Sequence, residues 1–114
     1  MNLFSEAYDG ILVVHVDEPR LDAAIAIRFK EQMREVTVQP APRVILDMSK
    51  IQFLDSSGLG AVVAVMKSLA PHRQLELCGL TGNVDKVFRL TRMDTVFRIH
   101  PDLDTALNAG RKYA

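Results

Sequence analysis

The side chains best suited to chemistry lie together in Asp55-Ser56-Ser57-Gly58, which offers two hydroxyls beside a carboxylate. This segment joins a strand-like apolar run, residues 44–46, to a helix-like run that begins at Leu59. The hydroxyls are therefore predicted at a helix N-terminus, where the first backbone N–H groups lack intrahelical partners and the helix dipole is positive. A phosphate added there would be tolerated within the chain and would repel whatever docks against it. The pattern predicts a modification switch more than a catalyst.

A plain helix cap is the competing interpretation, because Ser and Asp are both favoured N-cap residues. Capping needs one such residue, and this segment has three. Gly58 and Gly60 leave the backbone open to close approach, although each costs roughly 0.5–1 kcal/mol relative to Ala inside a helix. If Ser57 is the cap, its replacement by Ala should cost about 1 kcal/mol. On chemistry alone, the switch and the cap are equally supported.

Two further carboxylates, Asp22 and Asp47, are predicted near strand-to-helix junctions, as Asp55 is. Such residues cap helices or end strands, and Asp22 is well placed to cap the helix that follows it. If the junctions share one edge of a sheet, the three carboxylates would surround Ser56. They could then present its hydroxyl to a phosphorylating enzyme and repel the phosphate once it is attached.

The common catalytic and cofactor patterns are not met. A hydrolase nucleophile elbow needs Gly two residues before and two residues after the serine; Ser56 has only the second, and Ser57 has neither. Phosphate-loop and dinucleotide-binding glycine patterns are missing, and one cysteine with three scattered histidines gives no metal-ligand spacing. None of the histidines has an evident orienting carboxylate; they are His15, His72 and His100. We predict no enzymatic activity, no cofactor and no metal.

The surrounding elements are predicted from apolar periodicity. Runs of strand type cover residues 3–8, 11–16, 43–48, 74–80 and 96–99. The first two flank Asp9-Gly10, a hairpin signal in which both turn residues need positive φ. Helical spacing runs from Asp22 to Pro40 and from Ser57 to Pro71, with two shorter helices near 84–91 and 103–107. The order β-β-α-β-α-β-α-β-α predicts an α/β fold with a mixed sheet of about five strands and four helices.

Composition narrows the class of protein. The 114 residues fit one domain covering residues 1–114, and 48% hydrophobic residues supply a core. Zero formal net charge and a pI near 6.8 argue against nucleic-acid binding. Cys78, the only cysteine, is expected to be buried, and its lack of a disulfide partner fits a reducing compartment. With no run near the roughly 18 apolar residues of a membrane span and no basic signal-peptide region in residues 1–6, we expect a cytoplasmic protein without a membrane partner.

A longer pattern surrounds the two hydroxyls. Val44-Ile45-Leu46-Asp47-Met48-Ser49 leads through Ile51 and Phe53 to Leu54-Asp55-Ser56-Ser57-Gly58-Leu59-Gly60. With weaker likeness in residues 87–94, 96–97 and 103–107, the chain from about residue 11 to 107 resembles a single-domain STAS protein of the anti-sigma factor antagonist type. The family's motif, Asp-Ser-Ser/Thr-Gly-Leu-Gly, is matched in full.

The resemblance implies a function. Ser56, the first hydroxyl after the motif Asp, would be phosphorylated by a partner that is both anti-sigma factor and serine kinase. The unphosphorylated protein would bind this partner and free a sigma factor, phosphorylation would release the partner, and a serine phosphatase would reset Ser56. The partner-binding residues implied are Asp22, Asp55, Ser56, Ser57, Gly58 and Leu59.

The chain departs from the family pattern in three places. Glu18-Pro19-Arg20 stands where Gly is usual, Ala23-Ala24 where polar residues are common, and Arg92 where Gly often ends the third helix. A left-handed Arg92 would cost of order 1 kcal/mol. Two alternatives stay open. One is a STAS module that is never phosphorylated and serves as a scaffold or transporter-associated regulatory subunit. The other is a small enzyme with Ser56 as nucleophile, which the missing elbow makes remote.

Overall fold

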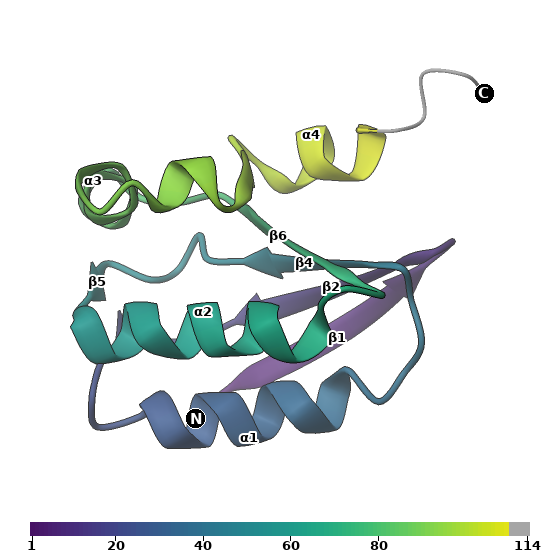
Figure 1. Cartoon of the computed structure of the whole chain (residues 1–114), viewed down its shortest axis with the longest axis horizontal. Helices are drawn as coiled ribbons and strands as arrows, with labels where there is room; N and C mark the ends of the chain where they lie inside the picture. Colours follow the sequence, from purple (N-terminus) through teal and green to yellow (C-terminus); the bar gives the residue numbers. More distant parts are fainter. Residues whose placement is uncertain (110–114) are drawn as a thin grey trace.

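Five strands form the main sheet of this α/β protein, in a computed structural model that describes residues 1–109. They are β1 (Leu3–Tyr8), β2 (Ile11–Val16), β4 (Arg43–Asp47), β6 (Gln74–Cys78) and β7 (Arg98–His100). Their spatial order is β1-β2-β4-β6-β7 (Figure 1). β1 is antiparallel to β2, and the other pairs are parallel. The predicted mixed sheet is confirmed.

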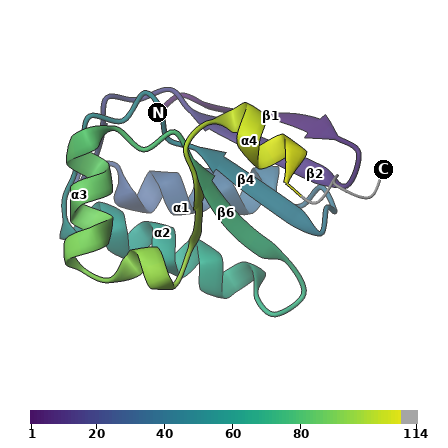
Figure 2. The same cartoon turned by 90° about the horizontal axis from the view of Figure 1, so that it is seen from above.

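Four α-helices accompany the sheet within residues 1–109: α1 (Ala26–Val36), α2 (Ser56–Leu69), α3 (Gly82–Leu90) and α4 (Leu103–Asn108). A short 3₁₀ turn, η1 (Met93–Thr95), follows α3. α1 and α2 lie side by side on one face of the sheet, and α4 lies on the other (Figures 1 and 2). None of the helices in this range is long and apolar enough to cross a lipid bilayer.

The central strand, β4, is buried from both sides because its side chains alternate between two cores. Val44 and Leu46 belong to the larger core with residues of α1, α2 and α3. Ile45 points the other way and packs with Cys78 and Ala106 under α4. Both faces of β4 are therefore covered.

A second, two-stranded sheet was not predicted from the sequence. It pairs β3 (Arg20–Leu21) with β5 (Phe53–Leu54) in parallel, with Leu21 opposite Leu54. Both leucines are buried in the larger core. A strand of two residues is too short to show an apolar period, so sequence patterning could not reveal it.

Two turn positions test the predicted backbone. Gly10 has φ +73°, but Asp9 keeps a negative φ, so the prediction of positive φ at both hairpin positions is wrong. A turn of type II geometry needs positive φ at its second central residue only. Arg92 is left-handed, with φ 64°, directly after Thr91, the C-cap residue of α3. The residue therefore adopts the conformation for which the family pattern favours Gly.

Candidate functional site

The pairing of β3 with β5 assembles the site, because it brings two loops together that are far apart in the sequence. Each short strand ends in a buried leucine followed by an aspartate: Leu21-Asp22 and Leu54-Asp55. The register sets Leu21 opposite Leu54, so the loop before α1 and the loop before α2 start side by side. In Figure 1 both loops lie at the end of the sheet where β5 and α3 are found.

Asp55 links the two loops through its side chain. Oδ1 accepts a hydrogen bond from the Gly58 N–H at 2.8 Å and caps α2, while Oδ2 accepts one from the Ala23 N–H at 3.1 Å. The Gly58 N–H contributes most to holding the pKa of Asp55 below its usual value, with support from the N–H groups of Ala23 and Ser57. The suggestion that Ser57 caps the helix is therefore wrong, because Asp55 already occupies the cap.

Gly58 is buried, and its closeness to another backbone segment belongs to the fold itself. A Cβ at this position would lie 2.0 Å from the Leu21 carbonyl oxygen, a distance that no side chain tolerates. The expectation that Gly58 offers open backbone to a partner is wrong, since Leu21 fills that space. Gly60 does have open space around it and is exposed.

The two serines remain accessible at the start of α2. Ser56 is its first residue, and both Ser56 and Ser57 are exposed, while Leu59 is half-buried. The positive end of the helix dipole therefore lies at an accessible hydroxyl. A hydroxyl in this position can be reached by another protein.

Asp22 does not cap α1 as predicted. The helix begins at Ala26, its N-cap position is Ile25, and no side chain caps it there. Asp22 instead stabilises the turn before the helix: Oδ1 accepts from the Ala24 N–H, and its backbone carbonyl accepts from Ile25 and Ala26. The apolar spacing predicted a helix from Asp22, but α1 begins about one helical turn later, at Ala26, and the residues between form this turn.

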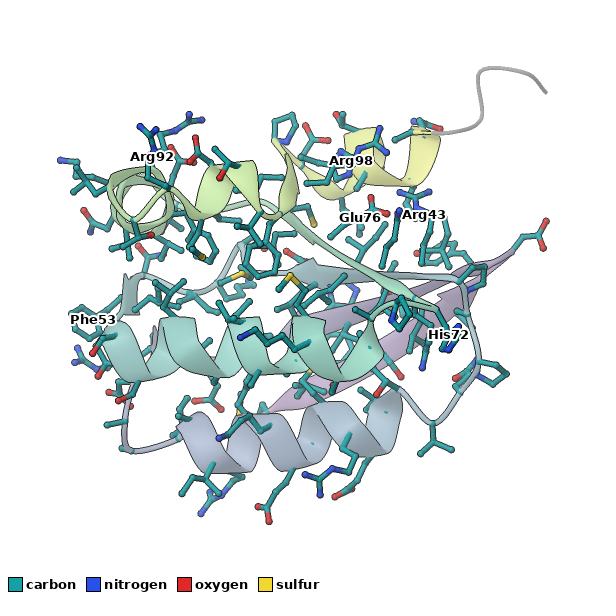
Figure 3. The ribbon with its side chains drawn as sticks, viewed as in Figure 1. Arg43, Phe53, His72, Glu76, Arg92 and Arg98 are labelled. Carbon is teal, nitrogen blue, oxygen red and sulfur yellow. The ribbon has the colours of Figure 1, made fainter. Side chains whose placement is uncertain are left out.

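Two residues of this end of the molecule were missed from the sequence. The Arg20 Nε donates to Asp22 Oδ2 at 3.1 Å, and its guanidinium lies 4.2 Å from the centre of the Phe53 ring. Phe53 is 41% exposed and stands at the end of α2 where Ser56 lies (Figure 3). A repeated pattern could have found them, since Arg20-Leu21-Asp22 and Phe53-Leu54-Asp55 share the order x-Leu-Asp.

Asp47 does not join this cluster. Its Oδ2 lies 2.8 Å from His15 Nδ1, and its Oδ1 accepts from the Ser49 N–H. The other nitrogen of His15, Nε2, lies 2.7 Å from Glu6 Oε1. His15 therefore has two carboxylate partners, contrary to the sequence expectation. The β2–β4 register, which places His15 opposite Asp47, explains the first of them.

The remaining titratable candidates are structural. His100 Nε2 lies 2.8 Å from Glu76 Oε1 in a buried pair, so this histidine too has a carboxylate that the sequence did not reveal. His72 is exposed. Cys78 is fully buried as expected, and burial, with the charges of Asp47 and Asp102, raises the pKa of its thiol to about 12. Within residues 1–109, no cluster of three His, Cys, Asp or Glu side chains could hold a metal ion.

Comparisons with known proteins identify relatives both by sequence and by structure. The anti-sigma-B factor antagonist of Listeria monocytogenes is 29% identical over 80 residues, which cover 69% of this chain and 70% of the relative. An anti-sigma factor antagonist from Mycobacterium paratuberculosis has a crystal structure with a TM-score of 0.86 and 27% identity, covering 97% of this chain and 94% of that one.

A murine anion transporter of solute carrier family 26 contains a similar fold, with a TM-score of 0.81 and 18% identity over 93% of this chain and 18% of the transporter. At that identity the likeness is one of fold alone. The family model of the STAS domain matches residues 3–106. Its extent over the whole main sheet, α1, α2, α3 and most of α4 shows that the chain belongs to the STAS domain family.

Proposed function

We propose that this protein is an anti-sigma factor antagonist whose binding is switched by phosphorylation of Ser56. The curated relatives that carry this name support the partner class, an anti-sigma factor. The observation that carries the switch is the exposed Ser56 at the first position of α2, next to a cap formed by Asp55 alone. With the cap already supplied, the Ser56 hydroxyl is left for another role.

Charge decides which form binds. A phosphate on Ser56 adds about −1.5 to −2 charges at pH 7. Within the chain the helix dipole offsets roughly 0.3–1 kcal/mol of this. In a docked interface an unpaired charge costs about 2–5 kcal/mol, which weakens binding roughly 30- to 3,000-fold. The cost in the complex exceeds the gain in the free protein, so the unphosphorylated form binds the anti-sigma factor and frees the sigma factor, and phosphorylation releases the partner.

The proposed kinase is the anti-sigma factor itself, and a serine phosphatase restores the binding form. The protein acts as a regulatory binding protein in the cytoplasm and not as an enzyme. Within residues 1–109 no histidine hydrogen-bonds to Ser56 or Ser57, which supports binding over nucleophilic catalysis. A scaffold or transporter-associated role has no separate observation in its favour.

The first test follows Ser56 directly. Incubation with a candidate anti-sigma serine kinase and ATP should add one phosphate, measured by intact mass. Ser56→Ala should abolish the addition, while Ser57→Ala, one residue away and also exposed, should retain it. Ser56→Asp should raise the Kd for the kinase at least tenfold, measured by calorimetry, and Ser57→Asp should raise it less. Phosphate on wild type that survives Ser56→Ala would assign the switch to another residue; no phosphate at all would favour the scaffold.

A further inference from the structure

A groove separate from the Ser56 site runs between α1 and α2, near the end of both helices. It has a volume of about 350 Å³. Its floor is apolar and formed by Met33, Val65 and Leu69, each less than 10% exposed. Lys30 and Arg34 line it from α1. The groove is therefore a hydrophobic trough with basic side chains along one wall.

Within residues 1–109, the basic wall has no salt-bridge partner. Among residues 1–109, the recorded salt bridges occupy the arginines at positions 20, 43 and 89, and none involves Lys30 or Arg34. Both side chains are exposed. The carboxylates of α1 itself, Glu31 and Glu35, do not line the groove. Lys30 and Arg34, one helical turn apart, repel each other mildly, although the helix dipole favours Arg34 in the last turn of α1.

Arg73 also lines the groove but is committed elsewhere. Its guanidinium donates to the backbone carbonyls of Thr37, Gln39 and Ala41, and so fixes the connection between α1 and β4. Its positive charge remains next to the groove and adds to that of Lys30 and Arg34. The groove thus carries three cationic side chains, and the described part of the chain contributes no carboxylate to its lining.

Exposed apolar side chains flank the two cations. Ile27 is 69% exposed and Val38 is 79% exposed. Along the chain Ile27, Lys30, Arg34 and Val38 are spaced by three and four residues, which places them along one side of α1 and its extension. In chain order, this surface therefore presents one apolar side chain, two basic side chains and a second apolar side chain. A complementary segment has carboxylates in its middle and apolar side chains at its ends.

The groove lies more than one Debye length along α2 from Ser56. The α2 residues that line it, from Ala64 to Leu69, follow Ser56 by eight to thirteen residues on the same helix, about 12–20 Å at the helical rise per residue. The Debye length is about 8 Å at physiological salt. The charge of a phosphate on Ser56 is therefore strongly screened at the groove.

We propose that the α1–α2 groove binds an acidic amphipathic segment of the anti-sigma factor, as a second contact that is independent of Ser56. The inference rests on the proposed function, because it takes the anti-sigma factor as the partner. The segment sets its carboxylates against Lys30 and Arg34 and its apolar side chains into the trough. This contact keeps the anti-sigma factor aligned on the surface, and the phosphorylation state of Ser56 determines whether it dissociates.

The test compares two charge reversals of equal size. Lys30→Glu with Arg34→Glu should raise the Kd for the purified anti-sigma factor about tenfold or more and weaken its dependence on salt. Arg28→Glu with Lys86→Glu changes the net charge by the same amount at exposed positions outside the groove, and should change the Kd less than twofold. Circular dichroism checks folding, and Lys30→Gln with Arg34→Gln gives a milder second variant.

Combination with Ser56→Asp tests independence. The fold-changes from the groove variant and from Ser56→Asp should multiply, because the two sites are far apart on this chain and have no contacting residues in common. Carbodiimide, which joins an amine directly to a carboxylate, should link Lys30 to an Asp or Glu of an amphipathic segment, identified by mass spectrometry.

Equal affinities for the two charge-reversal variants, or no link from Lys30 in the complex, would overturn the groove while leaving Ser56 as the switch if Ser56→Asp still weakens binding. No effect of Ser56→Asp together with no phosphorylation would overturn the proposed function instead.

Discussion

Gly58 is the residue at which the site is most sensitive to a single added atom. Because the atom closest to a new Cβ is the Leu21 carbonyl oxygen, relief requires movement of β3. The position therefore couples the loop of Ser56 to the loop of Asp22. Sequence patterning identifies Gly58 as unusual but assigns its closeness to a partner, because the neighbour is 37 positions away in the chain.

Gly58→Ala should destabilise the protein by about 3 kcal/mol, the upper end of what overpacking costs, because a backbone atom cannot swing aside. Gly60→Ala is the matched control on the same helix, two residues on, with open space around it. It should stabilise by about 0.5–1 kcal/mol. Urea denaturation of both variants measures the difference. Equal effects of the two substitutions would show that β3 moves away at little cost.

The Asp55 side chain hydrogen-bonds to the loop before α1 and to the start of α2, so its removal should destabilise both segments. Its pKa in the folded protein lies below the ordinary value of 3.8, so its stabilising effect is complete above that pH and is lost as pH falls through the folded pKa. At pH 7, Asp55→Ala should lower the Tm by about 5 °C. The gap between wild type and variant should close as the pH falls below 3.8.

Ser57→Ala is the control for the cap, since Ser57 is exposed and the cap belongs to Asp55. It should change stability by less than about 0.5 kcal/mol. A larger loss of stability for Ser57→Ala than for Asp55→Ala in thermal melts would show that Ser57, and not Asp55, caps α2.

At the scale of elements, α4 is the shortest of the four α-helices described, so its own backbone hydrogen bonds stabilise it least. It has six residues, and one buried residue, Ala106. Arg43 Nη1 and Nη2 donate to the carbonyls of Ala109 and Ala106, each at 3.0 Å. Glu76 holds Arg43 by two hydrogen bonds of 2.7 Å (Figure 3). The buried ion pair thereby fastens α4 to the sheet.

Glu76→Gln should weaken this attachment. Burial opposes ionisation of Glu76, but the hydrogen bonds from Arg43 and His100 outweigh it and hold the pKa below its ordinary value of 4.5. Its contribution is therefore complete above pH 4.5 and is lost as pH falls through the folded pKa. At pH 7 the variant should lose about 3 kcal/mol, because Arg43 is left without its counter-charge.

Two measurements check the role of Glu76. Denaturation at pH 7 and at pH 4 should show a smaller pH dependence for Glu76→Gln than for wild type, and amide exchange should quicken first in α4. Glu31→Gln, at an exposed position, serves as control. Unchanged exchange in α4 would mean that its apolar contacts alone hold it.

For the whole molecule, the sequence predicts what depends on local periodicity and fails where distant segments meet. β2, β4, α1 and α2 carry apolar patterns long enough to identify, so the order of elements is confirmed. β3 and β5 are two residues each and escaped detection. The roles of Ser56 and its neighbours in binding stay predictions, since geometry establishes their exposure and not their partner.

The carboxylate partners show the same division. His15 meets Asp47 only through the register of β2 with β4, and His100 meets Glu76 from the neighbouring strand. Among three adjacent cap candidates, Asp55 is selected in part by the N–H of Ala23, 32 residues earlier. Such choices are made by tertiary contacts that no local pattern contains.

The buried thiol of Cys78 has a practical consequence. With a pKa near 12, it carries almost no thiolate at neutral pH and is shielded from reagents. A cysteine introduced at an exposed position outside the groove, such as Val96, would therefore be the one site that a maleimide dye labels. No native cysteine then has to be removed before fluorescence experiments that follow a partner arriving and leaving in real time.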